Sequence, residues 1–135
     1  MSDSYPHCFA CGEDSPIGLH LVFRYEDGDA ICDCVIAPEF QGYNGIVHGG
    51  IIATLLDEAM AKAVLHAGFT AMTGRLEVSY RKPIMVETPL TLRGRIDSSR
   101  GRIHRCSAEV IDAQGEVCAA GTSTYVRARQ GLCPL

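Results

Sequence analysis

Hydrophobic and polar residues alternate along most of this chain, and the alternation begins at residue 17. Residues 17–25 place leucine, phenylalanine and tyrosine side chains on one face, and residues 30–36 alternate again. Between them, residues 26–29 have the sequence Glu-Asp-Gly-Asp, which is typical of a tight turn. Period-two alternation indicates a half-buried β-strand, so the pattern predicts a β-hairpin over residues 17–36.

The one long interruption of this pattern is an apolar stretch over residues 50–67. Gly68 comes directly after it, where a glycine commonly ends a helix, so the stretch predicts the only long helix of the chain. Alternation returns beyond the helix, and residues 97–101 form a predicted loop within it. Four more strands are predicted, over residues 72–81, 90–96, 103–111 and 116–127.

The predicted order of elements is two strands, one helix and four strands, which is an α+β arrangement. Because the helix is largely apolar, we expect a curved antiparallel sheet of about six strands to wrap around it. Residues 1–16 are polar and irregular, and residues 17–135 are predicted to form a single domain without repeats. Such a sheet keeps an outer face and edge strands, so we expect the chain to form a homo-oligomer.

The composition is typical of a soluble globular protein. The chain has 135 residues, of which 47% are hydrophobic and 21% charged, and its net charge is −4. The basic residues are scattered, unlike those of a nucleic-acid-binding surface, and no apolar run reaches the roughly 18 residues that span a bilayer. The N-terminus does not resemble a signal peptide, so we expect a cytoplasmic protein that binds neither nucleic acid nor membrane.

Seven cysteines are many for this length, and their number is odd, which argues against a framework of disulfides. Cys8 and Cys11 form a C-x-x-C pair beside His7, the most metal-like spacing in the chain. A structural zinc site usually needs two such pairs, and the second pair is missing, so we expect no metal. Four other cysteines are predicted to be small core residues: Cys32, Cys34, Cys106 and Cys118.

Two neighbouring carboxylates on the predicted helix face different surroundings, because successive helical residues are about 100° apart. Glu58 has Lys62 at the i+4 position and His66 one turn further on, which indicates a solvated face. Asp57 lies among small and apolar side chains and has no cation one turn away. A carboxylate there is costly to bury unless other groups satisfy it, so Asp57 is either an exposed surface acid or a reacting group.

Gly49 and Gly50 begin the helix, and they are either only a tight turn or a binding feature. Unpaired N–H groups at a helix N-terminus can bind negative charge that develops on oxygen, and glycine lets a substrate approach the backbone. Gly49 and Asp57 lie about 12 Å apart along the axis, too far for one acyl group to reach both. We therefore expect two antiparallel helices, related by a twofold axis, to supply them in trans.

Three stretches of sequence carry a family resemblance. They are Gly45-x-Val47-His48-Gly49-Gly50, then Leu55-x-Asp57-Glu58, and the predicted strand from Met72 to Pro83 with its Tyr80-Arg81-Lys82-Pro83 end. Together they resemble hotdog-fold acyl-CoA thioesterases of the phenylacetyl-CoA thioesterase type, over about residues 17–128. The resemblance implies a hotdog fold that hydrolyses acyl-CoA thioesters without a cofactor, as a homodimer or a dimer of dimers.

The resemblance also implies roles for individual residues. Asp57 matches the nucleophile or general base, with Glu58 as the alternative acid, and Gly49 matches the donor to the thioester oxygen. His48 matches a residue that orients the site or contacts the thioester. Thr73 matches a position where some relatives carry a hydroxyl that helps to place water, from the other subunit.

One departure from the family concerns the position six residues before the histidine, where relatives often carry asparagine or glutamine. This chain has Gly42 there, and Gln41 or Asn44 would have to replace the missing amide. For Arg81 and Lys82, contact with the CoA phosphates and a solvated charge at a strand end are both open. The predicted substrate contacts are Gly50, Asn44, Glu58, Arg81 and Lys82.

Two other functions remain open on the sequence. A hotdog dehydratase or hydratase acts on acyl thioesters with a histidine and an acid, whereas the acid here lies mid-helix after His-Gly-Gly, which favours hydrolysis. A non-catalytic acyl-CoA-binding protein would keep the pocket without needing Asp57. The chain has no G-x-S-x-G elbow and no phosphate loop, so neither of those chemistries competes.

Overall fold

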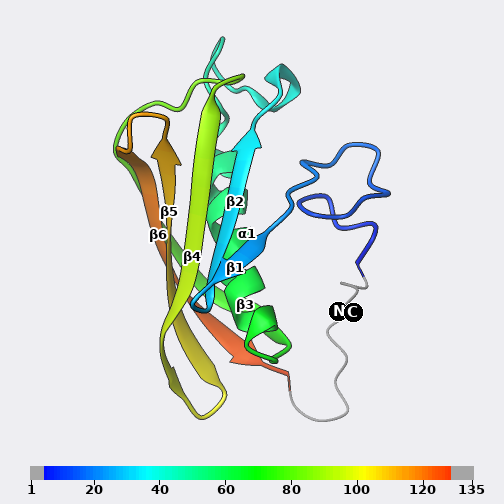
Figure 1. Ribbon diagram of the computed structural model, residues 1–135, viewed down its shortest axis with the longest axis vertical. Helices are drawn as coiled ribbons and strands as arrows, with labels where there is room; N and C mark the ends of the chain where they lie inside the picture. Colours follow the sequence, from blue (N-terminus) through cyan, green and yellow to red (C-terminus); the bar gives the residue numbers. More distant parts are fainter. Residues whose placement is uncertain (1–4, 129–135) are drawn as a thin grey trace.

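One long helix lies against one face of a six-stranded antiparallel sheet in this computed structural model, which describes residues 5–128 (Figure 1). The order of strands across the sheet is β1-β2-β4-β5-β6-β3. The predicted α+β arrangement is therefore confirmed. The elements are β1 (Arg24–Glu26), β2 (Asp29–Val35), the short 3-10 helix η1 (Pro38–Phe40), α1 (Gly49–His66), β3 (Ala71–Tyr80), β4 (Pro89–Arg100), β5 (Ile103–Asp112) and β6 (Val117–Arg127).

Helix α1 packs closely on the sheet because glycine lies beneath it. It runs from Gly49 to His66 and is followed by Gly68, whose φ of 98° ends it, as the sequence predicts. Under its middle, a side chain at Gly94 of β4 would overlap the backbone carbonyl of Ala59 and lie 2.8 Å from the nitrogen of Met60. The missing side chain lets the helix backbone rest on the strand, which fixes the position of the mid-helix residues.

The predicted strand over residues 17–25 is wrong for most of its length, since only Arg24–Glu26 pair as a strand. His20 has a φ of 52°, which breaks an extended backbone. The backbone donors of Leu19 and Leu21 go to the carbonyls of Phe9 and Ala10, at 2.7 and 2.9 Å. The N-terminal segment, not the sheet, therefore accepts the backbone hydrogen bonds of this stretch. Leu21 is nevertheless buried, as the alternation indicates.

The predicted loop over residues 97–101 is also mostly wrong, because β4 continues to Arg100. A bulge between Ile96 and Ser98 shifts the register against β5, and the strands turn only at residues 101–102. Figure 1 shows this long hairpin extending past the end of α1.

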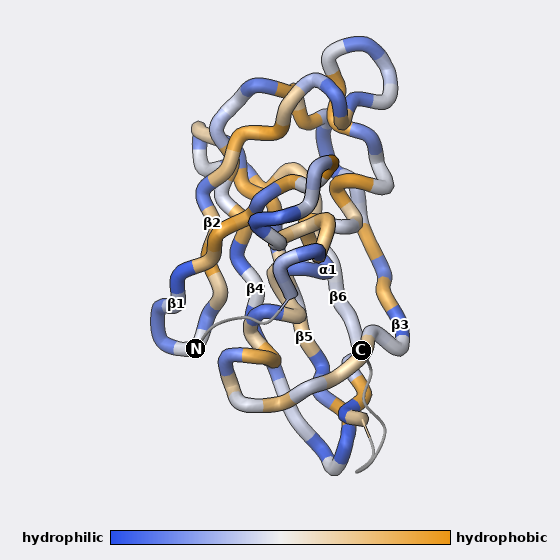
Figure 2. Tube along the Cα trace, turned by 90° about the vertical axis from the view of Figure 1, so that its right-hand side faces the viewer, coloured by the Kyte–Doolittle hydropathy of each residue, from blue (hydrophilic) through white to orange (hydrophobic). Residues whose placement is uncertain are grey.

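The outer face of the sheet is charged. Figure 2 shows hydrophilic and hydrophobic residues alternating along the strands, as expected for a sheet with one covered face. Arg24 donates to Asp33 at 2.6 Å, and Arg93 donates to Asp29 at 2.8 Å. These pairs, the first exposed and the second partly buried, lie on β1, β2 and β4, so this side of the sheet is a polar surface. No helix within residues 5–128 is long and apolar enough to cross a membrane.

The six cysteines within residues 5–128 are free thiols. Cys32, Cys106 and Cys118 are buried, which confirms their prediction as core residues, and Cys34 is half-buried. Cys133 lies outside the described residues.

A buried histidine gives the fold an expected pH dependence. His104 on β5 is 1% exposed, stacks on Phe69 and shares a 2.7 Å hydrogen bond with Ser99. Burial, and then the charge of Arg127, lowers its pKa below the ordinary value of 6.5, so the native state favours the neutral ring. Because the unfolded chain binds the proton more readily, stability falls as the pH drops below 6.5, by less than about 1.4 kcal/mol per pH unit.

Urea unfolding at about pH 7.5 and about pH 5.5 measures this dependence. His104→Gln removes the titrating group, so it should reduce the loss of stability between the two conditions. The matched control is His66→Gln, which removes an exposed histidine of α1 and leaves His104 in place. An equal slope in the wild-type protein and His104→Gln would contradict the prediction.

Candidate active site

The carboxylate of Asp57 is half-buried in the middle of α1, with one oxygen held and the other open. Its Oδ1 accepts hydrogen bonds from Thr73 Oγ1 at 2.8 Å and from the Tyr125 hydroxyl at 2.5 Å. Within residues 5–128, Oδ2 has no hydrogen-bond donor. The two hydroxyls therefore fix the orientation of the carboxylate and leave one oxygen for a water molecule or a substrate.

Tyr125 on β6 is a site residue that the sequence analysis missed. Its ring is 1% exposed, and its hydroxyl also lies 2.7 Å from the main-chain oxygen of Asp57. Burial, and then the negative charge of Asp57, raises the pKa of the phenol, so the hydroxyl remains a donor. The sequence did contain one indication of this role, a tyrosine on a strand with alternating hydrophobic residues. A tyrosine hydroxyl that is buried there needs a hydrogen-bond partner.

Thr73 on β3 contacts Asp57 of the same chain. This contact lies within one chain, and the contribution of a hydroxyl from the other subunit stays a prediction. The strand brings Thr73 to the helix beside a register shift between Thr73 and Arg75. A bulge of this kind redirects side chains at the edge of a sheet.

The helix N-terminus offers a donor at Gly49 but not at Gly50. The N–H of Gly50 donates to Nδ1 of His48 at 2.9 Å, so His48 caps the helix. No acceptor within the described part of the chain takes the N–H of Gly49, while its carbonyl accepts from the Tyr80 hydroxyl at 2.7 Å. Because Nδ1 of His48 is an acceptor here, the neutral ring carries its proton on the exposed Nε2.

Of the two amides in the loop before the helix, Gln41 is engaged within the loop itself. A side chain at Gly42 would lie 3.3 Å from the Cα atom of His48, so the position is crowded. Gln41 Oε1 accepts from the N–H of Gly45 at 2.8 Å, which commits that amide oxygen to the shape of the loop. Asn44 is exposed on the same loop.

The solvated face predicted for Glu58 and Lys62 is wrong. Lys62 is 6% exposed and its ammonium lies 3.9 Å from the carboxylate of Glu58, which is half-buried. The N-terminal segment covers this side of α1: Tyr5, Cys8 and Cys11 line one cavity together with Glu58 and Lys62. Helical periodicity alone gave no sign of that cover.

The two basic residues after β3 have different surroundings. Lys82 Nζ lies 2.5 Å from Asp112 Oδ2 and 3.5 Å from Glu116 Oε2, so it holds the turn between β5 and β6. The hydrogen bond from Lys82 lowers the pKa of Asp112 to about 2. Arg81 is exposed, and its side chain has no ion-pair partner within residues 5–128. Of the two, Arg81 is the more available to a phosphate.

A largely apolar cavity of about 430 Å³ lies beside the two residues that donate to Asp57. Thr73 and Tyr125, the two donors to Asp57, line it together with apolar side chains that include Leu65, Phe69 and Met72. This arrangement places an apolar space next to a carboxylate, which suits a molecule with an apolar part and a reactive polar group.

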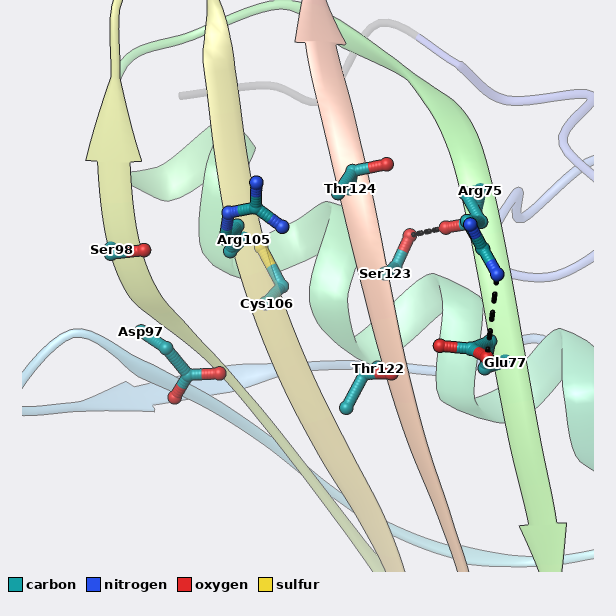
Figure 3. A pocket seen from close by; sticks show the side chains of 9 residues that line it. All are labelled: Arg75, Glu77, Asp97, Ser98, Arg105, Cys106, Thr122, Ser123 and Thr124. Atoms are coloured by element: carbon teal, nitrogen blue, oxygen red, sulfur yellow. Dashed lines mark hydrogen bonds and ion pairs between the residues drawn. The ribbon is translucent and has the colours of Figure 1, made fainter.

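A second hollow, of about 440 Å³, lies on the opposite face of the sheet. Figure 3 shows its polar lining, with α1 behind the strands, an ion pair of 3.6 Å between Arg75 and Glu77, and Ser123 donating to the carbonyl of Arg75. Burial raises the pKa of its one thiol, Cys106, to about 12, so that group stays protonated. The chemistry is therefore better placed at Asp57.

Sequence comparison decides the family. The profile of the Thioesterase superfamily matches residues 44–119, which includes all of α1 with Gly49 and Asp57. The chain belongs to the thioesterase superfamily. A solved structure described as a thioesterase superfamily protein is 30% identical to it, with a TM-score of 0.85, and covers 90% of this chain and 60% of that one. This agreement confirms the hotdog fold and the family resemblance.

The chain is also similar to an acyl-CoA thioesterase and to a protein of a phenylacetic acid degradation operon. Acyl-coenzyme A thioesterase THEM4 from Bos taurus is 26% identical over 113 residues, which cover 81% of this chain and 46% of that protein. The PaaI protein from the phenylacetic acid degradation operon of E. coli shares the fold, with a TM-score of 0.76 at 18% identity, covering 82% of this chain and 81% of that one. The chain spans about half the length of the bovine relative it matches.

Proposed function

We propose that this protein hydrolyses acyl-CoA thioesters, with Asp57 as the nucleophile or general base. The observation that carries the proposal is the Asp57 carboxylate, with one oxygen held by Thr73 and Tyr125, two residues that also line an apolar cavity, and the other without a donor within residues 5–128. Membership of the thioesterase superfamily and the acyl-CoA thioesterases among its relatives support it. A protein of the same fold from Streptococcus mutans was solved with bound acetyl-CoA, so this fold accommodates CoA esters.

Either role of Asp57 gives a balanced reaction. As a base, its free oxygen takes a proton from water while the hydroxide adds to the acyl carbon, and the proton then passes to the departing thiolate. As a nucleophile, the oxygen displaces the thiolate and forms an anhydride, which water cleaves to the acid. A thiolate leaves readily, so a carboxylate is sufficient for the chemistry.

The polarising donor in this proposal is the unpaired N–H of Gly49 at the N-terminus of a second helix. About 12 Å separates Gly49 from Asp57 along one helix axis, so a single helix cannot serve one acyl group with both. The ten-residue strand β3 carries Thr73 and is an edge strand within residues 5–128, where no other strand pairs with its outer side, which suits pairing with a second copy. A homodimer with two sites, and a dimer of dimers built from it, is therefore part of the proposal.

Thiol release from a panel of short, medium, long and aromatic acyl-CoAs tests the proposal and identifies the acyl group. Turnover of at least one class is expected. Addition of water to an enoyl-CoA, followed separately, would assign the protein to the hydratases instead. Binding of acyl-CoA with no turnover of any thioester would make it a carrier and overturn the proposal. A catalytically active monomer, found by sedimentation at assay concentration, would contradict the shared site.

Thr73→Val should lower kcat by about 10- to 100-fold, because it removes one hydrogen bond to a charged group, worth about 1.5–3 kcal/mol. The side chain is exposed and valine has a similar shape, so the fold should persist. Thr73→Ser keeps the hydroxyl and should restore most of the activity. Equal kcat values for the valine and serine variants would contradict the role of the hydroxyl.

A further inference from the structure

A cluster of two thiols and a carboxylate lies at the other end of the apolar cavity. Cys8 Sγ, Cys11 Sγ and a carboxylate oxygen of Glu58 all lie within 4.8 Å of one another, and each side chain is partly buried. The two cysteines come from the N-terminal segment, whereas Glu58 comes from α1. A structural zinc site usually takes its further ligands from a second cysteine pair. Here the third potential ligand is a carboxylate from helix α1.

The backbone around the two cysteines is tightly wound. The N–H of Gly12 donates to the carbonyl of Cys8 at 2.7 Å, and the N–H of Cys8 donates to the carbonyl of Tyr5 at 3.1 Å. A side chain at Gly12 would overlap the carbonyl of Pro6 and lie 2.6 Å from the nitrogen of Cys8. Only glycine fits there, so the loop holds both sulfur atoms on one side of a compact turn.

The same loop is fixed to the rest of the molecule. Its middle residues accept backbone hydrogen bonds from Leu19 and Leu21, and Ala10 is 2% exposed in the core. The two sulfur atoms are therefore held near Glu58 by the packing of the loop, without a disulfide bond between them. Preorganised donor atoms reduce the entropy that is lost when an ion is bound.

The electrostatics of the cluster favour a cation. The sulfur atoms of Cys8 and Cys11 lie within 4.8 Å of a carboxylate oxygen of Glu58, so thiolates there would face a carboxylate. A divalent ion would replace the thiol protons and turn this repulsion into attraction. Lys62 is the neighbouring cation, 3.9 Å from Glu58, and one ammonium cannot balance two thiolates and a carboxylate.

We propose that Cys8, Cys11 and Glu58 form a Zn²⁺ site that fastens the N-terminal segment to helix α1. Two thiolates and one carboxylate oxygen are ligands that Zn²⁺ accepts in a tetrahedral geometry, whereas Mg²⁺ and Ca²⁺ prefer oxygen alone. Within residues 5–128 no fourth histidine, cysteine or acidic side chain joins the cluster, so the fourth position is left for water. Binding releases the two thiol protons to solvent and involves no redox change.

The zinc ligands line the same cavity as Thr73 and Tyr125, but zinc binding does not rest on the proposed thioester hydrolysis. The ligands other than Glu58 lie before residue 17 and outside residues 44–119, which match the superfamily profile. Zinc binding can therefore be present in a protein without thioesterase activity, and the reverse also holds.

The test uses the full chain, purified under a reducing agent that does not bind metal and stripped with a chelator. Titration with Zn²⁺ should give one ion per chain, and Co²⁺ should give a thiolate-to-cobalt charge-transfer absorption with the intensity of two thiolates. Cys8→Ser and Cys11→Ser should each weaken Zn²⁺ binding by about 100-fold or more, and Glu58→Gln by about 10-fold or more. Limited proteolysis should cleave within residues 5–16 more slowly when Zn²⁺ is bound.

Cys34→Ser is the matched control, because it removes one thiol of the other close cysteine pair and should leave Zn²⁺ binding unchanged. The wild-type chain alone can overturn the proposal. It would do so by binding less than about 0.1 equivalent of Zn²⁺ per reduced chain, or by giving a cobalt spectrum without thiolate bands. If Cys34→Ser weakened Zn²⁺ binding as much as Cys8→Ser does, the binding would not be specific to Cys8 and Cys11, and the proposal would be overturned as well.

Discussion

Replacing Asp57 with asparagine should lower the rate of acyl-CoA hydrolysis by about 100-fold or more, as expected when an acid–base or nucleophilic group is lost. Asparagine has nearly the same size, and its amide oxygen can still accept the hydrogen bonds from Thr73 and Tyr125. The fold should therefore persist while the reactive oxygen is lost. Thiol release, measured on the best substrate of the acyl-CoA panel, checks the expectation.

The matched control for this change is Asp27→Asn at the turn between β1 and β2. Asp27 has a φ of 51°, a conformation that asparagine tolerates, and it lies outside the site. It should leave both kcat and stability unchanged. Hydrolysis that is indifferent to Asp57→Asn would move the chemistry to Glu58 or His48 and contradict the assignment of Asp57.

Gly94→Ala should remove about 3 kcal/mol of stability, a large fraction of the total for a domain of this size. The added methyl group would overlap the backbone of Ala59 in α1, which cannot move aside as a flexible side chain can. The helix would have to lift from β4 and open the core around it. Urea unfolding, or the amount of folded protein recovered, measures the loss.

Gly121→Ala is the comparison for that prediction, because Gly121 also lies in a strand beneath the helix. A methyl group there would be 3.3 Å from the carbonyl of Glu77 and 3.4 Å from the side chain of Leu56, so small shifts relieve the contact. Its effect should be clearly smaller than that of Gly94→Ala. Equal losses of stability would mean that close helix-to-sheet approach at Gly94 is not the cause.

Hydrophobic periodicity predicted the parts of the fold in which the backbone hydrogen bonds lie within the helix or between the strands of the sheet. Helix α1 and strands β3, β5 and β6 begin and end within about two residues of their predicted bounds. The prediction was wrong at residues 17–23, where alternation is present but the N-terminal segment takes the backbone hydrogen bonds. It was wrong again at residues 97–100, where a bulge continues the strand through polar residues.

The candidate site was predictable only where its residues lie close together in sequence. The Gly49 and Asp57 positions follow from helix spacing, whereas the contact between Asp57 and Tyr125 depends on how β6 registers under the helix. Burial of Lys62 depends likewise on the path of residues 5–16. A single sequence carries no direct signal for contacts of this long range.

The order of strands also determines when this protein can fold during its synthesis. Within residues 5–128, β3 pairs with β6 alone, and β6 follows the other five strands of the sheet in the sequence. Until then the nascent chain holds α1 and a ten-residue strand without its neighbour, with Leu76 and Val78 uncovered. Pairing across such a long separation is slow, and unpaired strands associate with other chains. The domain should therefore complete its fold only after β6 has been made, and chains interrupted before residue 117 should aggregate.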